Sequence, residues 1–248
     1  MREILQQELP YDVAAARPLP GIRPLDMADW LLRDEAFAAQ MAERERLLAA
    51  RREEVLALDP AARTAALELL DLVVAQAFPG AGDHVTRPDG VTVALDRTDP
   101  MDTLGRLAQE DFCILQKQGD EHVLTGAVLC FPASWTLREK FMRPLTTIHD
   151  PVDSYDQGMA RRVQRLFDGV RVGQPLWRFN ALWYVDPTLH QPRSVSDPRP
   201  RQTSGAAEFL RSERQTILRL PRSSAVVFAI HTFVVSRRDY EAHGQMPD

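Results

Sequence analysis

The sequence predicts an α+β fold in which an antiparallel sheet is flanked by helices. Helix-type periodicity runs through residues 26–78, and short strand-type runs begin at about residue 91. Helices before and between antiparallel strands favour this class over a doubly wound parallel sheet. The 248 residues contain no internal repeat and no low-complexity segment, and their length suits one large domain or two small ones.

The N-terminal part of the chain is expected to contain an arm and two helices. Residues 1–25 carry several prolines and no periodicity, which indicates an extended arm that wraps the body of the protein. Helical character begins near Asp26, which can act as an N-cap, and continues to a break at Asp59-Pro60. A second amphipathic helix follows over residues 61–78. The two helices (residues 26–78) should pack as a hairpin against a larger body.

The next part of the chain is expected to form most of the sheet. The predicted strands are VTVAL (91–95), DFCILQKQ (111–118), HVLTGAVLCF (122–131) and PLWRFNALWYV (175–185). Gly119-Asp120 favours a turn between the second and third of these strands. Residues 132–142 predict a short helix or an irregular linker, residues 152–170 predict a helix, and residues 186–203 predict a proline-rich loop.

The segment EFLRSERQTILRLPRSSAVVFAIHTFVV, residues 208–235, has the pattern of a helix followed by a strand. At about 100° per residue, the apolar side chains of its first half fall on one side, and Glu213 and Arg214 fall inside the same arc. A buried charge is costly unless it is paired, so these residues either satisfy each other or line a ligand pocket. In a pocket, Arg214 would meet an anion and Glu213 would hold a proton or a cationic group.

Charge and hydrophobicity argue against two broad classes of protein. The net charge of −5 disfavours a general nucleic-acid binder, which is normally basic. No apolar run approaches the roughly 20 residues of a membrane span, and the start MREILQQELPYD lacks the apolar core of a signal peptide. We therefore expect a cytoplasmic protein that binds neither nucleic acid nor membranes.

Common catalytic and metal-binding motifs are absent from the sequence. There is no Walker A loop, no GxGxxG after a strand, no HExxH and no GxSxG. Cys113 and Cys130 do not form a CxxC pair, which argues against a zinc or iron–sulfur site. Because both lie in apolar strand-like runs, we interpret them as buried thiols.

Two further places are candidates for a site. His149 lies in TTIHDPVDSYD, at a turn before a predicted helix. A histidine there is either structural or a metal ligand whose direction the neighbouring proline fixes. Trp135, Arg178 and Asn180, from FPASW and WRFNALW, form either a pocket wall or part of the core. The remaining histidines, His231 among them, show no mutual metal-ligand spacing.

These motifs occur together in a known family. From about Leu25 to Val235 the chain resembles the haem-dependent oxidative N-demethylase family. The resemblance rests on WLLRDEAFAAQMAERERLL, on QEDFCILQ followed by LTGAVLCFPASW, on IHDPV, and above all on RSERQTILRLPRSSAVVFAIHTF. The sequence departs from the family pattern at Asp153, which replaces the second proline after the histidine. It also departs after Asn180, where two residues precede the tryptophan.

The resemblance implies one haem-binding domain over residues 26–248, with a PAS-like core at about 90–235. It implies that haem b is the cofactor and that His149 is the axial ligand of its iron. The cationic partners of the haem propionates would be Arg211, Arg214 and Arg222. Trp135, Arg178 and Asn180 would line the cofactor site.

The resemblance also implies a reaction, the oxidative removal of an N-methyl group from a small methylated amine by O2, with release of formaldehyde. An amine is a cation at neutral pH, so a carboxylate in an apolar pocket would attract it, which gives Glu213 a catalytic role. The sequence contains no flavin or iron–sulfur motif, so the electrons would come from a separate reductase or a ferredoxin-type donor. A haem-based gas or redox sensor and a subunit without cofactor stay open as alternatives.

Overall fold

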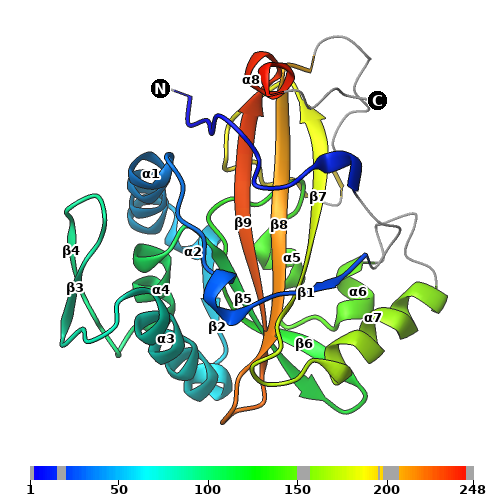
Figure 1. Cartoon of the computed structure of the whole chain (residues 1–248). Coiled ribbons are helices and arrows are strands. Elements are labelled where there is room, and N and C mark those ends of the chain that lie inside the picture. Colours follow the sequence, from blue (N-terminus) through cyan, green and yellow to red (C-terminus); the bar gives the residue numbers. More distant parts are fainter. Residues whose placement is uncertain (1–2, 16–20, 150–156, 195, 198–206, 244–248) are drawn as a thin grey trace.

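A seven-stranded sheet organises the protein, and the computed structural model describes residues 3–15, 21–149, 157–194, 196–197 and 207–243 (Figure 1). The strand order is β1-β7-β8-β9-β5-β6-β2, and all neighbours are antiparallel. These strands are β1 (Arg23–Pro24), β2 (Leu56–Leu58), β5 (Asp111–Gln118), β6 (Glu121–Val128), β7 (Leu176–Tyr184), β8 (Phe209–Arg219) and β9 (Val226–Ser236). A separate two-stranded sheet contains β3 (His84–Thr86) and β4 (Thr92–Ala94).

Helices precede the sheet and connect its strands. The α-helices are α1 (Phe37–Ala50), α2 (Arg52–Val55), α3 (Arg63–Ala77), α4 (Pro100–Leu107), α5 (Leu137–Lys140), α6 (Leu145–His149), α7 (Gln157–Gly169) and α8 (Arg237–Ala242). Short 3-10 helices are η1 (Val13–Ala15), η2 (Met27–Asp29) and η3 (Pro60–Ala62). Helices that lie before and between antiparallel strands confirm the predicted α+β class.

Four of the predicted strands are confirmed in the main sheet. Residues 111–118, 122–131 and 175–185 correspond to β5, β6 and β7, and the strand predicted in the second half of residues 208–235 corresponds to β9. Gly119 closes the β5–β6 hairpin with a φ of 61°, a conformation that glycine adopts without strain. Residues 91–95 are also extended, as β4, but this strand pairs with β3 outside the main sheet.

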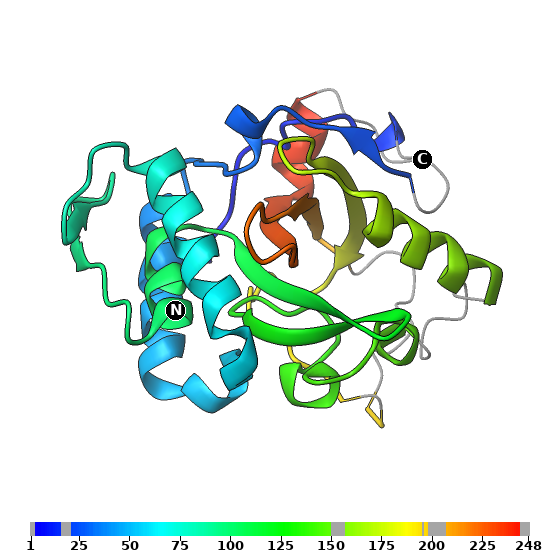
Figure 2. The ribbon, with the colours of Figure 1, turned by 90° about the horizontal axis from the view of Figure 1, so that it is seen from below.

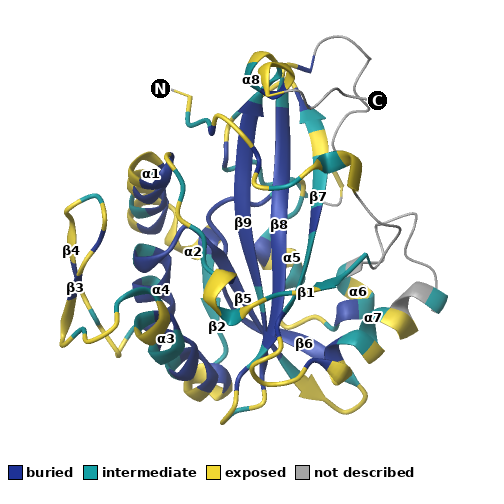
Figure 3. Cartoon of the chain, in the orientation of Figure 1, coloured by how far each residue is buried: buried dark blue, intermediate teal, exposed yellow. Residues whose placement is uncertain are grey.

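The helix predicted in the first half of residues 208–235 is wrong. These residues form β8, which pairs with β7 over residues 209–217 on one side and with β9 along its whole length on the other. Every residue from Leu210 to Leu218 is buried (Figure 3), because both faces of this central strand are covered. Polar side chains are buried on both faces, so the alternation that marks a half-exposed strand is absent from the sequence.

The first predicted helix is shorter than expected. Helix α1 begins at Phe37, and residues 56–58 form β2, which pairs with β6 at the edge of the sheet. Asp26 does act as an N-cap, because its side chain accepts a hydrogen bond from the backbone N of Ala28 (2.9 Å). The helix that it caps is a single 3-10 turn.

The second predicted helix is confirmed as α3, but the simple hairpin is not. An unpredicted helix, α4, packs against both α1 and α3 (Figures 1 and 2). Pro100 lies in its first turn, a favoured position for proline, and Met101 and Leu104 are buried. The packing is tight at Gly105, where an added Cβ would lie 2.8 Å from Val128 Cγ2.

The main sheet has two covered faces, which we name after neighbouring residues of β8. The Arg214 face packs against residues 3–15 and against the group of α1, α3 and α4. The Glu213 face packs against α5, α6 and α7, and α7 lies across the sheet from the α1–α3–α4 group (Figure 2). The strand and helix residues at the centre of the Glu213 face are Cys113, Leu115, Ile217, Ile230, Leu137, Leu145 and Phe167.

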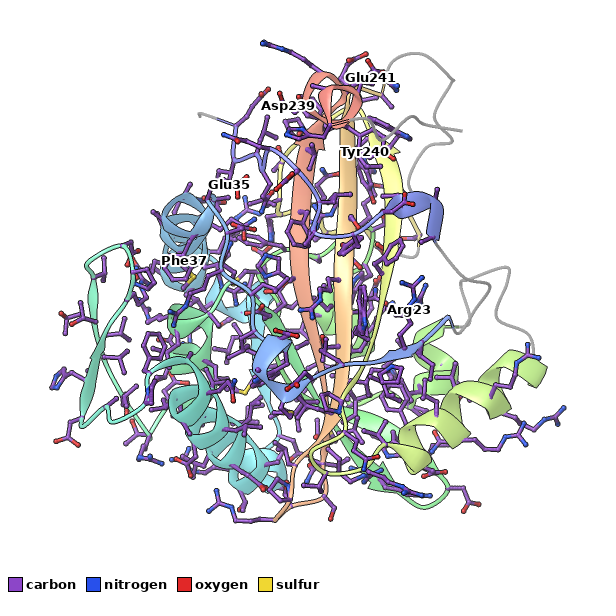
Figure 4. The ribbon with its side chains drawn as sticks, viewed as in Figure 1. Arg23, Glu35, Phe37, Asp239, Tyr240 and Glu241 are labelled. Atoms are coloured by element: carbon purple, nitrogen blue, oxygen red, sulfur yellow. The ribbon has the colours of Figure 1, made fainter. Side chains whose placement is uncertain are left out.

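The two ends of the described chain meet on the Arg214 face. The backbone N of Gln6 donates to the Val234 oxygen (2.9 Å), and the Tyr11 ring stacks on Phe179 at a centroid distance of 4.4 Å. Helix α8 follows β9, and Figure 4 shows Tyr240 there at the end of the long strands. These contacts cover the part of the Arg214 face that α1, α3 and α4 do not cover.

Candidate functional site

Glu213 and Arg214 lie on opposite faces of the sheet, because successive side chains of a strand alternate. Arg211 and Gln215 share the face of Glu213. The expectation that the two charges share one arc is therefore wrong, since it assumed a period of 3.6 residues where the true period is two. Glu213 and Arg214 do not form an ion pair, and each needs its own partners.

Amide groups hold the Glu213 carboxylate. Glu213 is 8% exposed, and its Oε2 accepts hydrogen bonds from Asn180 Nδ2 (3.2 Å) and Gln215 Nε2 (3.0 Å). Asn180 lies directly opposite on β7, and its Oδ1 accepts a hydrogen bond from the Glu213 backbone N (3.1 Å). The structure thus brings together two of the predicted site residues. Amide donors stabilise a carboxylate without neutralising it, so Glu213 can receive a cation.

Two half-buried cations, Arg178 and Lys140, interact with Glu213 through space. Arg178 lies two residues before Asn180 on the same face of β7. Lys140 ends α5, with its Nζ 4.7 Å from the ring centroid of Trp135. Burial lowers the pKa of each cation; the charges of Glu139 and Glu213 oppose this effect at Lys140, and the charge of Glu213 opposes it at Arg178. Neither cation forms an ion pair with a carboxylate of the described residues.

Lys140 is a site residue that the sequence did not single out, as are Gln215 and Thr232. It stands in the short stretch LREK with no spacing or motif of its own. The sequence signal available was its closeness to Trp135, five residues earlier, which was a candidate for the pocket wall. Only the position of α5 over the sheet brings Lys140 near Glu213.

Polar atoms beside Glu213 are buried without a partner among the described residues. These atoms are Arg178 Nε and the Oγ1 of Thr232, which lies opposite Glu213 on β9. A buried donor or acceptor that makes no hydrogen bond costs free energy, and such groups call for a ligand, an ion or a water. The Glu213 face therefore has unused hydrogen-bonding capacity next to a carboxylate.

An apolar floor extends from this polar cluster. Ile217 lies two residues beyond Gln215 on the same face, and Leu145 of α6 packs in the same apolar cluster. Arg219 fixes the end of α7 over this face, because its Nε donates to the Val170 oxygen (2.7 Å) and its Nη2 to the Phe167 oxygen (2.6 Å). The floor is thus anchored to the same strand that carries Glu213.

His149 is the last residue of α6, a helix that packs on the Glu213 face. Its side chain lies outside the described part of the chain, as do residues 150–156. The assignment of His149 as a metal ligand therefore stays a prediction.

Arg211 and Arg214, two of the three arginines expected to meet propionates, are engaged by backbone oxygens on different faces. Arg211 is buried on the Glu213 face and donates to the oxygens of Phe131 (2.7 Å) and Leu189 (2.9 Å). Arg214 donates to the Asp29 oxygen (2.7 Å) on the opposite face. These arginines hold loops to the sheet.

Arg222 lies far from both in the turn between β8 and β9. Its side chain is 67% exposed, and its Nη2 contacts Asp71 on α3 at 3.0 Å. Glu68 of the same helix accepts a hydrogen bond from the Ser223 backbone N (2.7 Å). Arg222 thus belongs to the contact between this turn and α3, and the structure does not bring the three arginines together.

His231 lies on the Arg214 face with both ring nitrogens engaged. Its Nε2 is 3.0 Å from Asp34 Oδ2, and its Nδ1 is 3.0 Å from Glu110 Oε1. Burial by itself lowers the pKa of His231, but the hydrogen bonds and charges of the two carboxylates outweigh burial and raise it to about 9. A protonated imidazole held by two carboxylates is not free to bind a metal.

Cys113 and Cys130 are buried free thiols, as predicted. Burial raises the pKa of each to about 12, so the thiolate form that a metal requires is disfavoured. Within the described ranges, no three His, Cys, Asp or Glu side chains gather to hold a metal ion.

His190 has an arrangement that the sequence did not indicate. Its Nδ1 lies 2.8 Å from the backbone oxygen of Cys130, and its Nε2 is buried without a partner in the described chain. A backbone acceptor on Nδ1 fixes the tautomer that leaves Nε2 as an acceptor, which is the state in which histidine binds metals. Its place in a proline-rich loop carries no pattern that singles it out.

An antiparallel sheet that buries a carboxylate beside an apolar floor, under short helices, makes this an α+β protein with a candidate ligand site on one sheet face. None of the helices described is long and apolar enough to cross a membrane. The chain belongs to the family of haem-dependent oxidative N-demethylase, alpha subunit-like proteins, whose model matches residues 21–248. The family resemblance seen in the sequence motifs is thereby confirmed.

Proposed function

We propose that this protein catalyses the haem-dependent oxidative N-demethylation of a small methylated amine. The observation that carries the proposal is Glu213, a nearly buried carboxylate that amides hold and that no described cation neutralises in an ion pair. A carboxylate in a partly dehydrated site attracts an ammonium ion more strongly than one in water does. Membership of the family supports haem as the cofactor.

The residues of the Glu213 face fit a haem group in their chemistry. A haem combines a large apolar ring with two carboxylates and needs an axial ligand. The apolar floor suits the ring, and Trp135 and Asn180 would border it. Arg178, whose Nε is buried without a described partner, would meet a polar edge of the cofactor. His149 would supply the axial imidazole from the end of α6.

The bound haem would supply the activation of O2. Overall, the methyl carbon leaves as formaldehyde with one oxygen atom, and the other oxygen atom leaves as water. This balance requires two electrons and two protons from outside, and we propose a separate reductase or ferredoxin-type protein as the electron donor. The chain itself would bind the ammonium at Glu213, orient that carboxylate through Asn180 and Gln215, and exclude water with α5, α6 and α7.

We also infer that the core of the sheet is PAS-like. The consecutive strands β5 to β9 lie in one antiparallel sheet, and α5, α6 and α7, which connect β6 to β7, pack on one of its faces. A cofactor between these helices and the sheet would contact the Glu213 face. This placement agrees with the position of the unpartnered polar atoms.

Haem binding is the first test of the proposal. The purified protein is titrated with haem, and its absorption spectrum and haem stoichiometry are measured. We expect His149→Ala to lose or loosen haem while the protein stays folded, whereas His84→Ala, an exposed position on β3, should bind normally. A normal spectrum for His149→Ala together with a changed spectrum for His190→Ala would move the axial ligand to His190.

Turnover is the second test. With haem, O2, a reductase and a methylated amine, we expect formaldehyde and the demethylated amine in equal amounts. NAD(P)H alone should support no turnover. Haem binding without formaldehyde release across a panel of methylated amines would refute the catalytic proposal and favour a haem-based sensor.

A further inference from the structure

We propose that Lys140 and Arg178 form a carboxylate-binding site beside Glu213. Binding of an amine at Glu213 rests on the proposed function. Binding of a carboxylate depends on the two cations, on their surroundings and on the lack of an ion pair for either of them within the described residues.

Arg178 is positioned by the sheet. It lies on β7 directly opposite Gln215, and the next residue on the same face, Asn180, lies opposite Glu213. Its Nε is buried and has no partner among the described residues. A guanidinium is always charged and offers five N–H donors in a planar fork that matches a carboxylate. A fork with a buried, unused N–H is therefore ready for a carboxylate.

Lys140 is positioned by helix α5. Leu137, three residues earlier, is buried in the apolar floor, and residues three apart lie on the same side of a helix. Lys140 accordingly points to the sheet, where its ammonium rests against the Trp135 ring. The neighbouring Glu139 is drawn away, since it accepts hydrogen bonds from Thr136 Oγ1 (2.9 Å) and Ser194 Oγ (2.6 Å).

No ion pair within the described residues neutralises these cations. Lys140 interacts through space with Glu139 and Glu213, and Arg178 interacts with Glu213, but neither cation forms an ion pair with these carboxylates. Half-buried cations are costly to keep without an anion, because burial removes part of their hydration. If an ammonium ion occupies Glu213, the positive charge of this cluster increases. A carboxylate is the group that completes this arrangement.

Two molecules can bring that carboxylate. One is the substrate itself, which would then be a zwitterionic N-methyl amino acid, with its ammonium at Glu213 and its carboxylate at the cation pair. The other is the haem, through a propionate. Both sources require the same chemistry from Lys140 and Arg178, and two pairs of ligands separate them.

The first pair is N-methylglycine and dimethylamine, which differ by one carboxylate. Binding to the haem-loaded protein is measured by calorimetry and by the change in the haem spectrum. We expect Lys140→Met and Arg178→Met to weaken binding of N-methylglycine about tenfold to a hundredfold, the value of a charge-assisted bond, and to leave dimethylamine unchanged. Glu213→Gln should weaken both ligands. The exposed neighbours Arg138→Met and Arg171→Met are the controls and should change neither.

The second pair is haem and haem dimethyl ester, in which the propionates carry no charge. If a propionate is the partner, the two Met variants lose affinity for haem and retain it for the ester. Melting temperatures are measured on the ligand-free variants. They should not fall below that of the wild type, because neither substitution breaks an ion pair within the described residues.

The outcomes distinguish a failure of the carboxylate site from a failure of the proposed function. Selective loss in either ligand pair supports the carboxylate site and identifies its source. Met variants that bind all four ligands like the wild type overturn it, even if the protein demethylates amines. If the wild type binds no haem, the proposed function fails, and N-methylglycine binding by the ligand-free protein still decides on the cation pair.

Discussion

Raising the pH should destabilise this protein through one buried histidine, His231. Its ring lies between Asp34 and Glu110, each at 3.0 Å, and it is 1% exposed. Its pKa is about 9 in the folded state, against an ordinary value of 6.5. The difference, 9 − 6.5, corresponds to about 3 kcal/mol of folding free energy, at about 1.4 kcal/mol for each pH unit. Because the folded-state pKa is raised, this contribution is fully present below about pH 6.5 and is lost as the pH rises to about 9.

Urea unfolding between pH 6 and pH 10 measures this effect. The free energy of unfolding of the wild type should fall by about 3 kcal/mol over that window in excess of the fall shown by His231→Gln, which cannot titrate. His231→Gln should also be less stable at pH 6, since it leaves two carboxylates without their cation. If that variant does not fold, Asp34→Asn is measured in its place. It keeps the hydrogen-bond geometry, removes one charge and should reduce the fall in the free energy of unfolding between pH 6 and pH 10. Parallel pH profiles for wild type and variant would show that folding does not raise the pKa of His231.

Four further substitutions test the packing and the site. Arg44→Met breaks a fully buried ion pair and should lower the free energy of unfolding, measured in urea, by about 3–5 kcal/mol. Arg46→Met breaks an exposed ion pair and should lower it by less than about 1 kcal/mol. Similar losses for the two variants would contradict the role of burial. Gly105→Ala should lower the melting temperature, because the new Cβ would lie 2.8 Å from Val128 Cγ2; an unchanged melting temperature would mean that α4 shifts freely. Glu213→Gln should retain fold and haem but lose roughly tenfold to a thousandfold of activity, and lost stability with retained turnover would return this residue to the core.

Strands β5, β6 and β7 could be predicted from sequence because each is a short β-type run bounded by turn residues, and this signal persists although β5 and β6 are buried over most of their length. Helix α3 could be predicted because it shows a clear helical period. The central strand β8 could not be predicted in the same way. Both of its faces are buried and both carry polar side chains, so its pattern of apolar residues imitates a helix.

The short elements were missed for a different reason. Residues 56–58 become a strand because an edge of β6 is available to pair with them, and nothing in three residues indicates this. Helix α4 is eight residues long and gains its stability from packing between α1 and α3. Local sequence stabilises such short elements weakly, so long-range contacts decide them.

The candidate site was predicted in part. Glu213 and Asn180 do meet, across β7 and β8, and Arg178 and Trp135 lie with them at the same face. The prediction that Arg214 lies beside Glu213 was wrong, because Arg214 points to the opposite face. A cation that does interact with Glu213 through space is Lys140, on a helix more than 70 residues earlier in the chain.

The sequence by itself determined the fold class, the family and the buried state of the two cysteines. These follow from composition, from motifs and from the costs of burying each residue type, which are local properties. The role of Glu213 as the carboxylate of the site stays a prediction. Only the tertiary structure decided which charges face one another. In a sheet, that choice depends on a period of two residues and on the register of neighbouring strands, so Glu213 meets Asn180 and Thr232 while the adjacent Arg214 reaches the other side of the molecule.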